Sequence, residues 1–177
     1  MQTRYGKLLI ALFCLMLALP AVAQQAPRAE ASTGTHLFQV VVLIGSKEMA
    51  KPSTDVPDNA RAAIEDIGQF LPYKSYRMVD TALIRSAGQG RGVMAGPDGR
   101  DYIVQLRYTK TGTTGKIFVS DFELLDPSRN ANPTLIQANP TLIQTSFEVD
   151  LRETIVVGSS KLNGGGEALI VLFTAVQ

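Results

Sequence analysis

A nearly continuous run of apolar and β-branched residues spans positions 37–44 and stops at Gly45. A second run of this kind, residues 168–176, closes the chain. Short runs that are apolar at almost every position are typical of strands covered on both faces. We therefore expect two fully buried strands, one near each end of the folded part of the chain.

One stretch shows the spacing of an amphipathic helix. Asp55 stands where a helix N-cap is expected, and Pro72 cannot continue a helix. Between them, apolar residues recur three or four positions apart, at Ala60, Ile64, Ile67 and Leu71. This is the single helix that the pattern predicts after the N-terminal region.

From Tyr73 onward, apolar and polar residues alternate with a period of two, which is typical of half-buried strands. Two glycine-rich segments, Gly88-x-Gly90-x-Gly92 and Gly96-Pro97-Asp98-Gly99, mark turns on either side of a short strand. In one of these strands Phe118 is expected on the inner face and Asp121 in water. The predicted strands are 73–86, 102–108, 116–125, 147–152, 154–157 and 168–176.

These elements predict an α+β fold, a strand-helix-strand unit followed by an antiparallel β-meander or sandwich, in a single domain over residues 36–177. One helix covers two or three strands spaced about 4.8 Å apart. That is fewer than the predicted sheet contains. The remaining apolar face must be covered by a second sheet layer or by another chain.

An internal repeat lies at residues 131–144, where Ala131–Gln137 recurs unchanged as Ala138–Gln144. Two copies cannot form a solenoid, and the Asn-Pro pair in each copy blocks a continuous helix. We interpret the repeat as a tandem duplication in a surface loop, because such loops accept insertions.

The N-terminal residues follow the order of a secretory signal peptide over 1–23. Arg4 and Lys7 give a positive start, an uncharged leucine-rich stretch follows, and Ala23 ends a small-x-small cleavage site. The apolar stretch is too short for a membrane-spanning helix, which needs about 20 residues. We expect cleavage between Ala23 and Gln24, with no transmembrane helix in the mature chain.

The mature chain is expected to begin with a flexible leader over 24–35 and to work outside the cytoplasm, in the periplasm, associated with the outer membrane or extracellular. Cys14 is the only cysteine, so the mature chain has no disulfide. Cleavage removes Arg4 and Lys7 from the 17 basic residues and leaves 15 against 16 acidic residues. Such a chain has no basic field for nucleic acid or anionic lipid.

Most motifs that could carry chemistry have a simpler structural interpretation. His36 is the only histidine, so no transition-metal site or histidine triad can be assembled. Asp126 and Ser128 begin an Asx-rich turn that lacks the glycine and glutamate of a calcium loop. Ser159 to Lys161 fit a solvated turn better than a serine-lysine nucleophile. We expect no metal and no cofactor.

A basic and aromatic stretch is the candidate interaction surface. Its side chains could bind an anionic polymer or the acidic edge of a partner, or could simply be solvated. The residues are Tyr73, Lys74, Tyr76, Arg77 and Arg85, with Arg91 nearby.

The C-terminal third resembles the β-rich core of bacterial secretins, a family of outer-membrane channels. The corresponding segments are Ser146–Val149, Glu153–Gly158 and Ala168–Thr174. The sequence departs from the family pattern at Arg152, where a glycine is usual, and at Ala175, where a proline is usual. The resemblance implies a component of an envelope assembly rather than a complete channel.

The sequence therefore favours a non-catalytic exported module that binds a protein partner or associates with itself, such as an accessory component of a secretion system. The alternative is a carboxylate-dependent hydrolase acting on cell-wall or polysaccharide substrates. Its candidates are two pairs of acidic residues that share a strand face, Asp121 with Glu123 and Glu148 with Asp150. A hydrolase needs two such groups in one cleft, one of them with a raised pKa.

The cleavage site gives the first testable prediction. Protein recovered from the exported fraction of its native host should begin at Gln24, which intact mass and terminal sequencing will measure. A mass that retains residues 1–23, or a lipid on Cys14, would contradict a soluble exported product.

Overall fold

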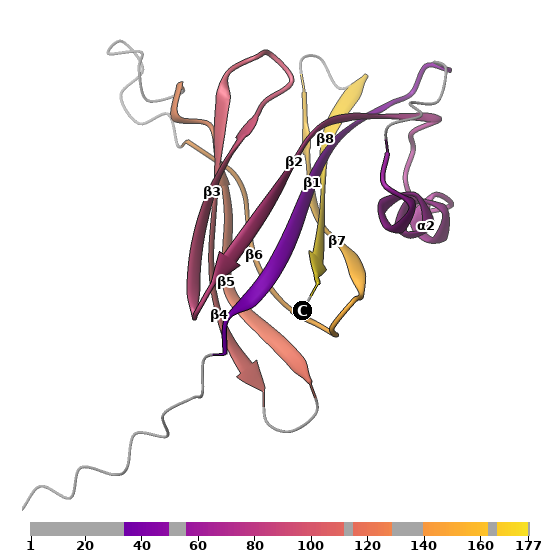
Figure 1. Cartoon of the computed structure of the whole chain (residues 1–177). Helices are drawn as coiled ribbons and strands as arrows, with labels where there is room; N and C mark the ends of the chain where they lie inside the picture. The colour runs from indigo at the N-terminus through magenta and orange to yellow at the C-terminus, as the bar shows by residue number, and fades with distance from the viewer. Residues whose placement is uncertain (1–33, 50–55, 112–114, 129–139, 163–165, 177) are drawn as a thin grey trace, which may run out of the picture. The chain divides into compact units, whose positions relative to one another are not determined.

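Eight strands and one helix make up the part of the chain that the computed structural model describes, residues 34–49, 56–111, 115–128, 140–162 and 166–176 (Figure 1). The elements are β1 (His36–Ser46), α2 (Asp58–Ile67), β2 (Ser75–Ser86), β3 (Gln89–Ala95), β4 (Asp101–Thr111), β5 (Lys116–Leu125), β6 (Thr141–Val149), β7 (Thr154–Lys161) and β8 (Glu167–Ala175). The predicted signal peptide, its cleavage site and most of the predicted leader lie outside these residues.

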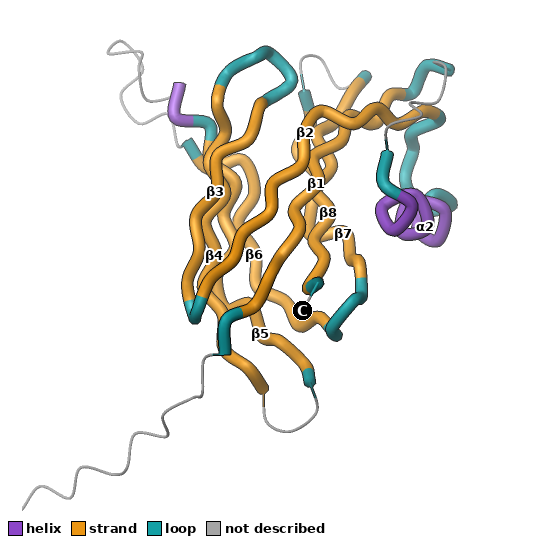
Figure 2. Tube along the Cα trace, viewed as in Figure 1, coloured by secondary structure: helices purple, strands orange, loops and turns teal. Residues whose placement is uncertain are grey.

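The strands form two antiparallel sheets that face each other (Figure 2). Sheet A has the order β2-β1-β8-β7, and sheet B has the order β3-β4-β5-β6. The prediction of an α+β fold is therefore wrong, because the described chain is mostly strand. The one short helix lies in the connection between β1 and β2, which pair antiparallel, and so builds no strand-helix-strand crossover.

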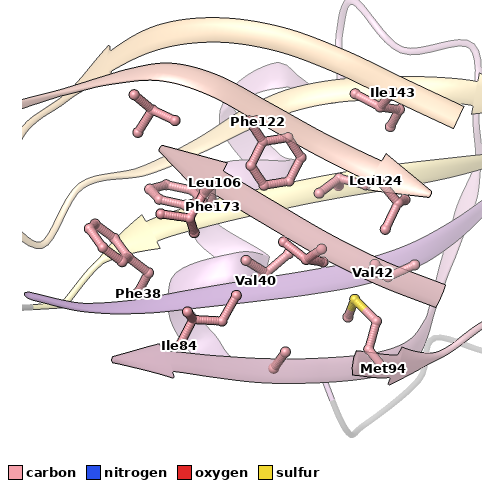
Figure 3. Close-up of a cluster of buried hydrophobic side chains, with 14 of the residues drawn as sticks. Phe38, Val40, Val42, Ile84, Met94, Leu106, Phe122, Leu124, Ile143 and Phe173 are labelled. Atoms are coloured by element: carbon pink, nitrogen blue, oxygen red, sulfur yellow. The ribbon is translucent and has the colours of Figure 1, made fainter. Parts of the chain in front are cut away.

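The main core fills the space between the two sheets (Figure 3). Phe38 and Val40 of β1 and Phe173 of β8 point inward from sheet A, and Leu106 and Phe122 meet them from sheet B. The rings of Phe122 and Phe173 lie edge to face with centroids 6.0 Å apart. Each buried phenylalanine contributes about 1.5–3 kcal/mol through burial, so this layer provides most of the apolar stabilisation.

On its outer face, sheet A is covered by α2 over the two central strands. Val41, Leu43, Ile170 and Leu172, the alternate residues of β1 and β8, pack with Ala60 and Ile64 of the helix. The two central strands are thus buried on both faces, as their sequences predicted. The sequence left open whether a second sheet layer or another chain covers the remaining apolar face. In the structure a second sheet layer covers it.

Asn59 fixes the helix on the sheet through polar contacts with three strands. Its Nδ2 donates to Gln39 Oε1 at 3.1 Å, to Thr174 Oγ1 at 3.1 Å and to Thr154 Oγ1 at 3.3 Å. The hydroxyls of Thr154 and Thr174 lie 2.8 Å apart. Two N–H bonds are therefore shared among three acceptors. Apolar packing holds the helix down, and this network sets its position.

The helix itself is shorter than predicted. It starts at Asp58 after Pro57 and ends at Ile67, with Gly68 as its C-cap, so Leu71 lies beyond it. Asp55, the predicted N-cap, lies outside the described residues.

Two β-bulges change which residues face inward. In β5 the register with β6 shifts between Val119 and Phe122, so that Ile117 and Val119 are buried while Phe118 is 37% exposed. The prediction that Phe118 lies inside is wrong, because the bulge interrupts the alternation. In β2 a bulge opposite Val42 and Leu43 has the same effect.

Glycines allow β2 and β3 to meet closely at one edge of the sandwich. A Cβ on Gly90 would lie 2.6 Å from Ile84 Cγ2, and one on Gly92 would lie 3.1 Å from the same side chain. Gly88 forms the turn with a φ of 91°. Only the first glycine of the Gly-x-Gly-x-Gly segment is therefore a turn residue. The other two are strand positions without room for a side chain.

Two segments expected as loops are strands. The last residues of the repeat, 141–144, begin β6, and Ile143 is part of the core, while residues 129–139 lie outside the described residues. Ser159 to Lys161 belong to β7 and pair with β8 rather than forming a solvated turn. Among the described residues, no helix has the length and apolar character to span a membrane.

Replacing Asn59 with alanine should lower the free energy of unfolding by about 1–2 kcal/mol, because Gln39 and the two threonines lose a shared donor. Urea denaturation measures the change. Glu65→Ala, at an exposed position of the same helix, is the matched control and should change stability by less than about 0.5 kcal/mol. Equal effects of the two substitutions would show that the network does not position the helix.

A candidate binding cleft at one end of the sandwich

The longer connections between strands lie at one end of the sandwich. Strands β1, β3, β5 and β7 finish at this end, and β2, β4, β6 and β8 begin there (Figure 1). The opposite end carries the connections from β2 to β3, from β4 to β5 and from β6 to β7. Binding residues are often placed on loops held by a rigid scaffold, so the first end is where a site is expected.

A cleft of about 340 Å³ opens there between the two sheets. From sheet A and its connections it is lined by Ile44, Arg77, Leu162 and Glu167. From sheet B and its connections it is lined by Pro97, Asp98, Arg100, Tyr102 and Asp126. The cleft thus combines apolar surface with charges of both signs.

Strand pairing explains why these side chains meet. Ile44 lies opposite Arg77 of β2, and Cα partners in neighbouring strands share a sheet face. Ile44 and Tyr102 are almost fully buried and form the apolar floor. Asp98 and Arg100 come from the hairpin between β3 and β4, which rises beside the cleft.

The sheet B side of the cleft is an internally bonded network. Arg100 Nε donates to Asp98 Oδ2 at 2.6 Å, and Arg100 Nη1 donates to the Ser128 hydroxyl. Ser128 in turn donates to Asp126 Oδ1, from its backbone N–H at 3.0 Å and from its hydroxyl at 2.5 Å. Asp126 is only 3% exposed. These side chains are hydrogen-bonded to one another along this wall of the cleft.

The hydrogen bond from Arg100 shifts the pKa of Asp98. It is the main cause that holds the pKa of this carboxyl below its usual value of 3.8, and burial acts in the other direction. Asp98 therefore stays ionised to a lower pH than an ordinary aspartate.

The sheet A side differs, because its charged groups are exposed and available. Within the described residues, neither the guanidinium of Arg77 nor the carboxylate of Glu167 has an ion pair or a side-chain hydrogen bond. Each therefore offers its full donor or acceptor capacity to a ligand.

Of the predicted interaction surface, only Arg77 reaches the cleft. Tyr73 and Tyr76 pack into the core beneath α2, where burial, assisted by Tyr73, raises the pKa of Tyr76. Lys74 is exposed beside β1. Arg85 lies opposite Leu37 on the outer face of sheet A, because the bulge in β2 places it and Arg77 on opposite faces.

The acidic pairs of the alternative hypothesis lie elsewhere. Asp121 and Glu123 are on the outer face of sheet B, where Gln144 donates to Glu123 at 3.0 Å. Asp150 lies 3.9 Å from Lys116, and Glu148 is exposed on β6. No group of three or more potential metal ligands occurs among the described residues.

The sequence did not single out Asp98, Arg100 or Glu167. The Gly-Pro-Asp-Gly run at residues 96–99 was recognised only as a turn. All three residues lie next to strand ends that meet at the same end of the sandwich. This shared position is the one signal that could have grouped them.

Comparison of the chain with protein-family models, curated proteins and solved structures finds no match.

The link between Arg100 and Asp98 can be tested by titration. Because the folded-state pKa of Asp98 is lowered, the stabilisation it gives is present at neutral pH and is lost as the pH falls through that pKa. Arg100→Ala should raise the pKa of Asp98 toward 3.8, measured by NMR titration of the carboxyl carbon. Arg85→Ala should leave it unchanged, and an unchanged value in Arg100→Ala would refute the link.

Proposed function

We propose that this chain is a non-catalytic, exported binding module that takes a protein partner into the end cleft. The observation that carries the proposal is the pair of uncompensated charges, Arg77 and Glu167, beside an apolar floor formed by Ile44 and Tyr102.

The covered sheet narrows the places where a partner can bind. The apolar outer faces of β1 and β8 already pack under α2, and their inner faces pack against sheet B. A partner that bound these faces would have to displace part of the core. The end cleft requires no such rearrangement.

The cleft suits a polypeptide better than a single small ion. An extended segment can place an apolar side chain on Ile44 and Leu162, a carboxylate on Arg77 and a cation on Glu167. Because the cleft is small, it accounts for part of a partner interface, which typically buries about 1,600 Å² in total. The neighbouring connections would supply the remainder.

The hydrolase alternative has weaker support in the same geometry. A general acid needs a raised pKa, whereas the pKa of Asp98 in this cleft is lowered by Arg100. Asp126 is buried and already accepts two hydrogen bonds from Ser128. Asp121 and Glu123 lie on an open sheet face rather than in the cleft.

The predicted signal peptide and the resemblance to secretins support a location in the cell envelope. An accessory role in a secretion assembly agrees with the signal peptide and with the resemblance. The partner bound in the cleft could also be a second copy of this chain. In that case the fraction of dimer rises with protein concentration, which sedimentation velocity measures.

The two arginines on β2 give a matched test. The exported protein is used to isolate its partner from the envelope of its native host, and binding to the purified partner is measured by calorimetry. Arg77→Glu should weaken binding about tenfold or more, because a partner carboxylate would meet a like charge. Arg85→Glu changes the same charge on the same strand, on the opposite face, and should alter binding less than about twofold.

Equal effects of the two substitutions would place the partner outside the cleft. Release of sugars from cell-wall material by the wild-type protein, lost in Asp126→Asn, would favour the hydrolase instead.

A further inference from the structure

The outer face of sheet B carries two rows of polar side chains across its strands. Strand pairing places Gln89, Arg107 and Asp121 in one row. The next row contains Arg91, Gln105, Glu123 and Gln144. A hollow of about 390 Å³ lies over the first row and the start of the second. The helix α2 packs on the other sheet, so it does not cover this face (Figure 2).

Two guanidiniums line this hollow without forming an ion pair with any described residue. Arg91 and Arg107 occupy diagonal positions on neighbouring strands, which places their Cα atoms about 7–8 Å apart. Neither side chain has an ion pair or hydrogen bond among the described residues. Asp121, opposite Arg107, accepts instead from Gln144 on β6 at 3.4 Å. An anion between the two arginines would relieve their repulsion and could accept paired hydrogen bonds from both guanidiniums.

The neighbouring groups restrict what else the ligand carries. Gln89 and Gln105 each present a donor and an acceptor that no described side chain uses, and Asp121 adds an acceptor. Hydroxyl groups both donate and accept hydrogen bonds, so they match side chains that offer a donor and an acceptor together. Leu106 is buried and Gly90 has no side chain, so the hollow offers little apolar contact.

We propose that this hollow binds an acidic saccharide, a sugar chain with uronic acid units. Arg91 and Arg107 hold its carboxylates, and Gln89, Gln105 and Asp121 hydrogen-bond its hydroxyls. The volume is that of a small-molecule site, and the open sheet face lets the chain continue past it. This site is separate from the end cleft and does not depend on it.

Calorimetry with three probes tests the proposal on the exported chain. The probes are a trimer of galacturonic acid, the uncharged galactose trimer and a polyphosphate of similar charge. We expect the galacturonate trimer alone to bind well. Arg91→Gln and Arg107→Gln should each weaken it about tenfold, and the lysine variants should recover part of the loss, because they restore charge without the planar fork.

Controls separate this site from general charge effects. Arg85→Gln, at an exposed position on the other sheet, should leave binding unchanged, and NMR shifts should centre on residues 89–91 and 105–107. Arg85, Arg91 and Arg107 are all exposed, so unchanged melting temperatures are expected for the arginine variants. Absence of galacturonate binding, equal binding of polyphosphate, or an equal loss in Arg85→Gln would overturn the proposal.

Discussion

The two central strands of sheet A need an apolar cover on each face, and the rest of the structure follows from that requirement. Strand β1 is the first described strand and β8 is the last, yet they pair side by side from Phe38 with Ala175 to Ser46 with Glu167. Sheet B covers one face and α2 covers the other. Contacts between residues so far apart in the chain carry a large loop-closure cost, so this fold should form slowly and as one unit.

Much of this arrangement could be predicted from the sequence. The runs at 37–44 and 168–176 indicated double burial, and the size of one helix required a further cover, by a second sheet layer or by another chain. The fold class was wrong because the strand-helix-strand unit was given the weight of a separate α+β element, whereas the described chain is mostly strand with one short helix between antiparallel neighbours. Alternation also failed at the bulges, as at Phe118, since an extra residue in one strand depends on its partner strand and leaves no local signal.

The candidate cleft was less predictable than the fold. Arg77 and Arg85 were both identified as basic residues of one stretch. Eight positions along an unbroken strand return to the same face, but the bulge in β2 places the two arginines on opposite faces. Asp98 and Glu167 were missed because their proximity depends on sheet order. Long-range pairing decides which hairpin ends converge, and no stretch of sequence encodes it alone.

The start of β6 gives the repeat a particular meaning. Because the two copies are identical, removing either one leaves the same chain, in which Thr-Leu-Ile-Gln still directly precedes Thr145. The duplication therefore adds seven residues ahead of the strand without changing any residue that pairs or packs within it. A lineage could gain or lose such a unit through slippage during replication while its core remained the same. The length of the connection between β5 and β6 can thus change in evolution without a change in the core.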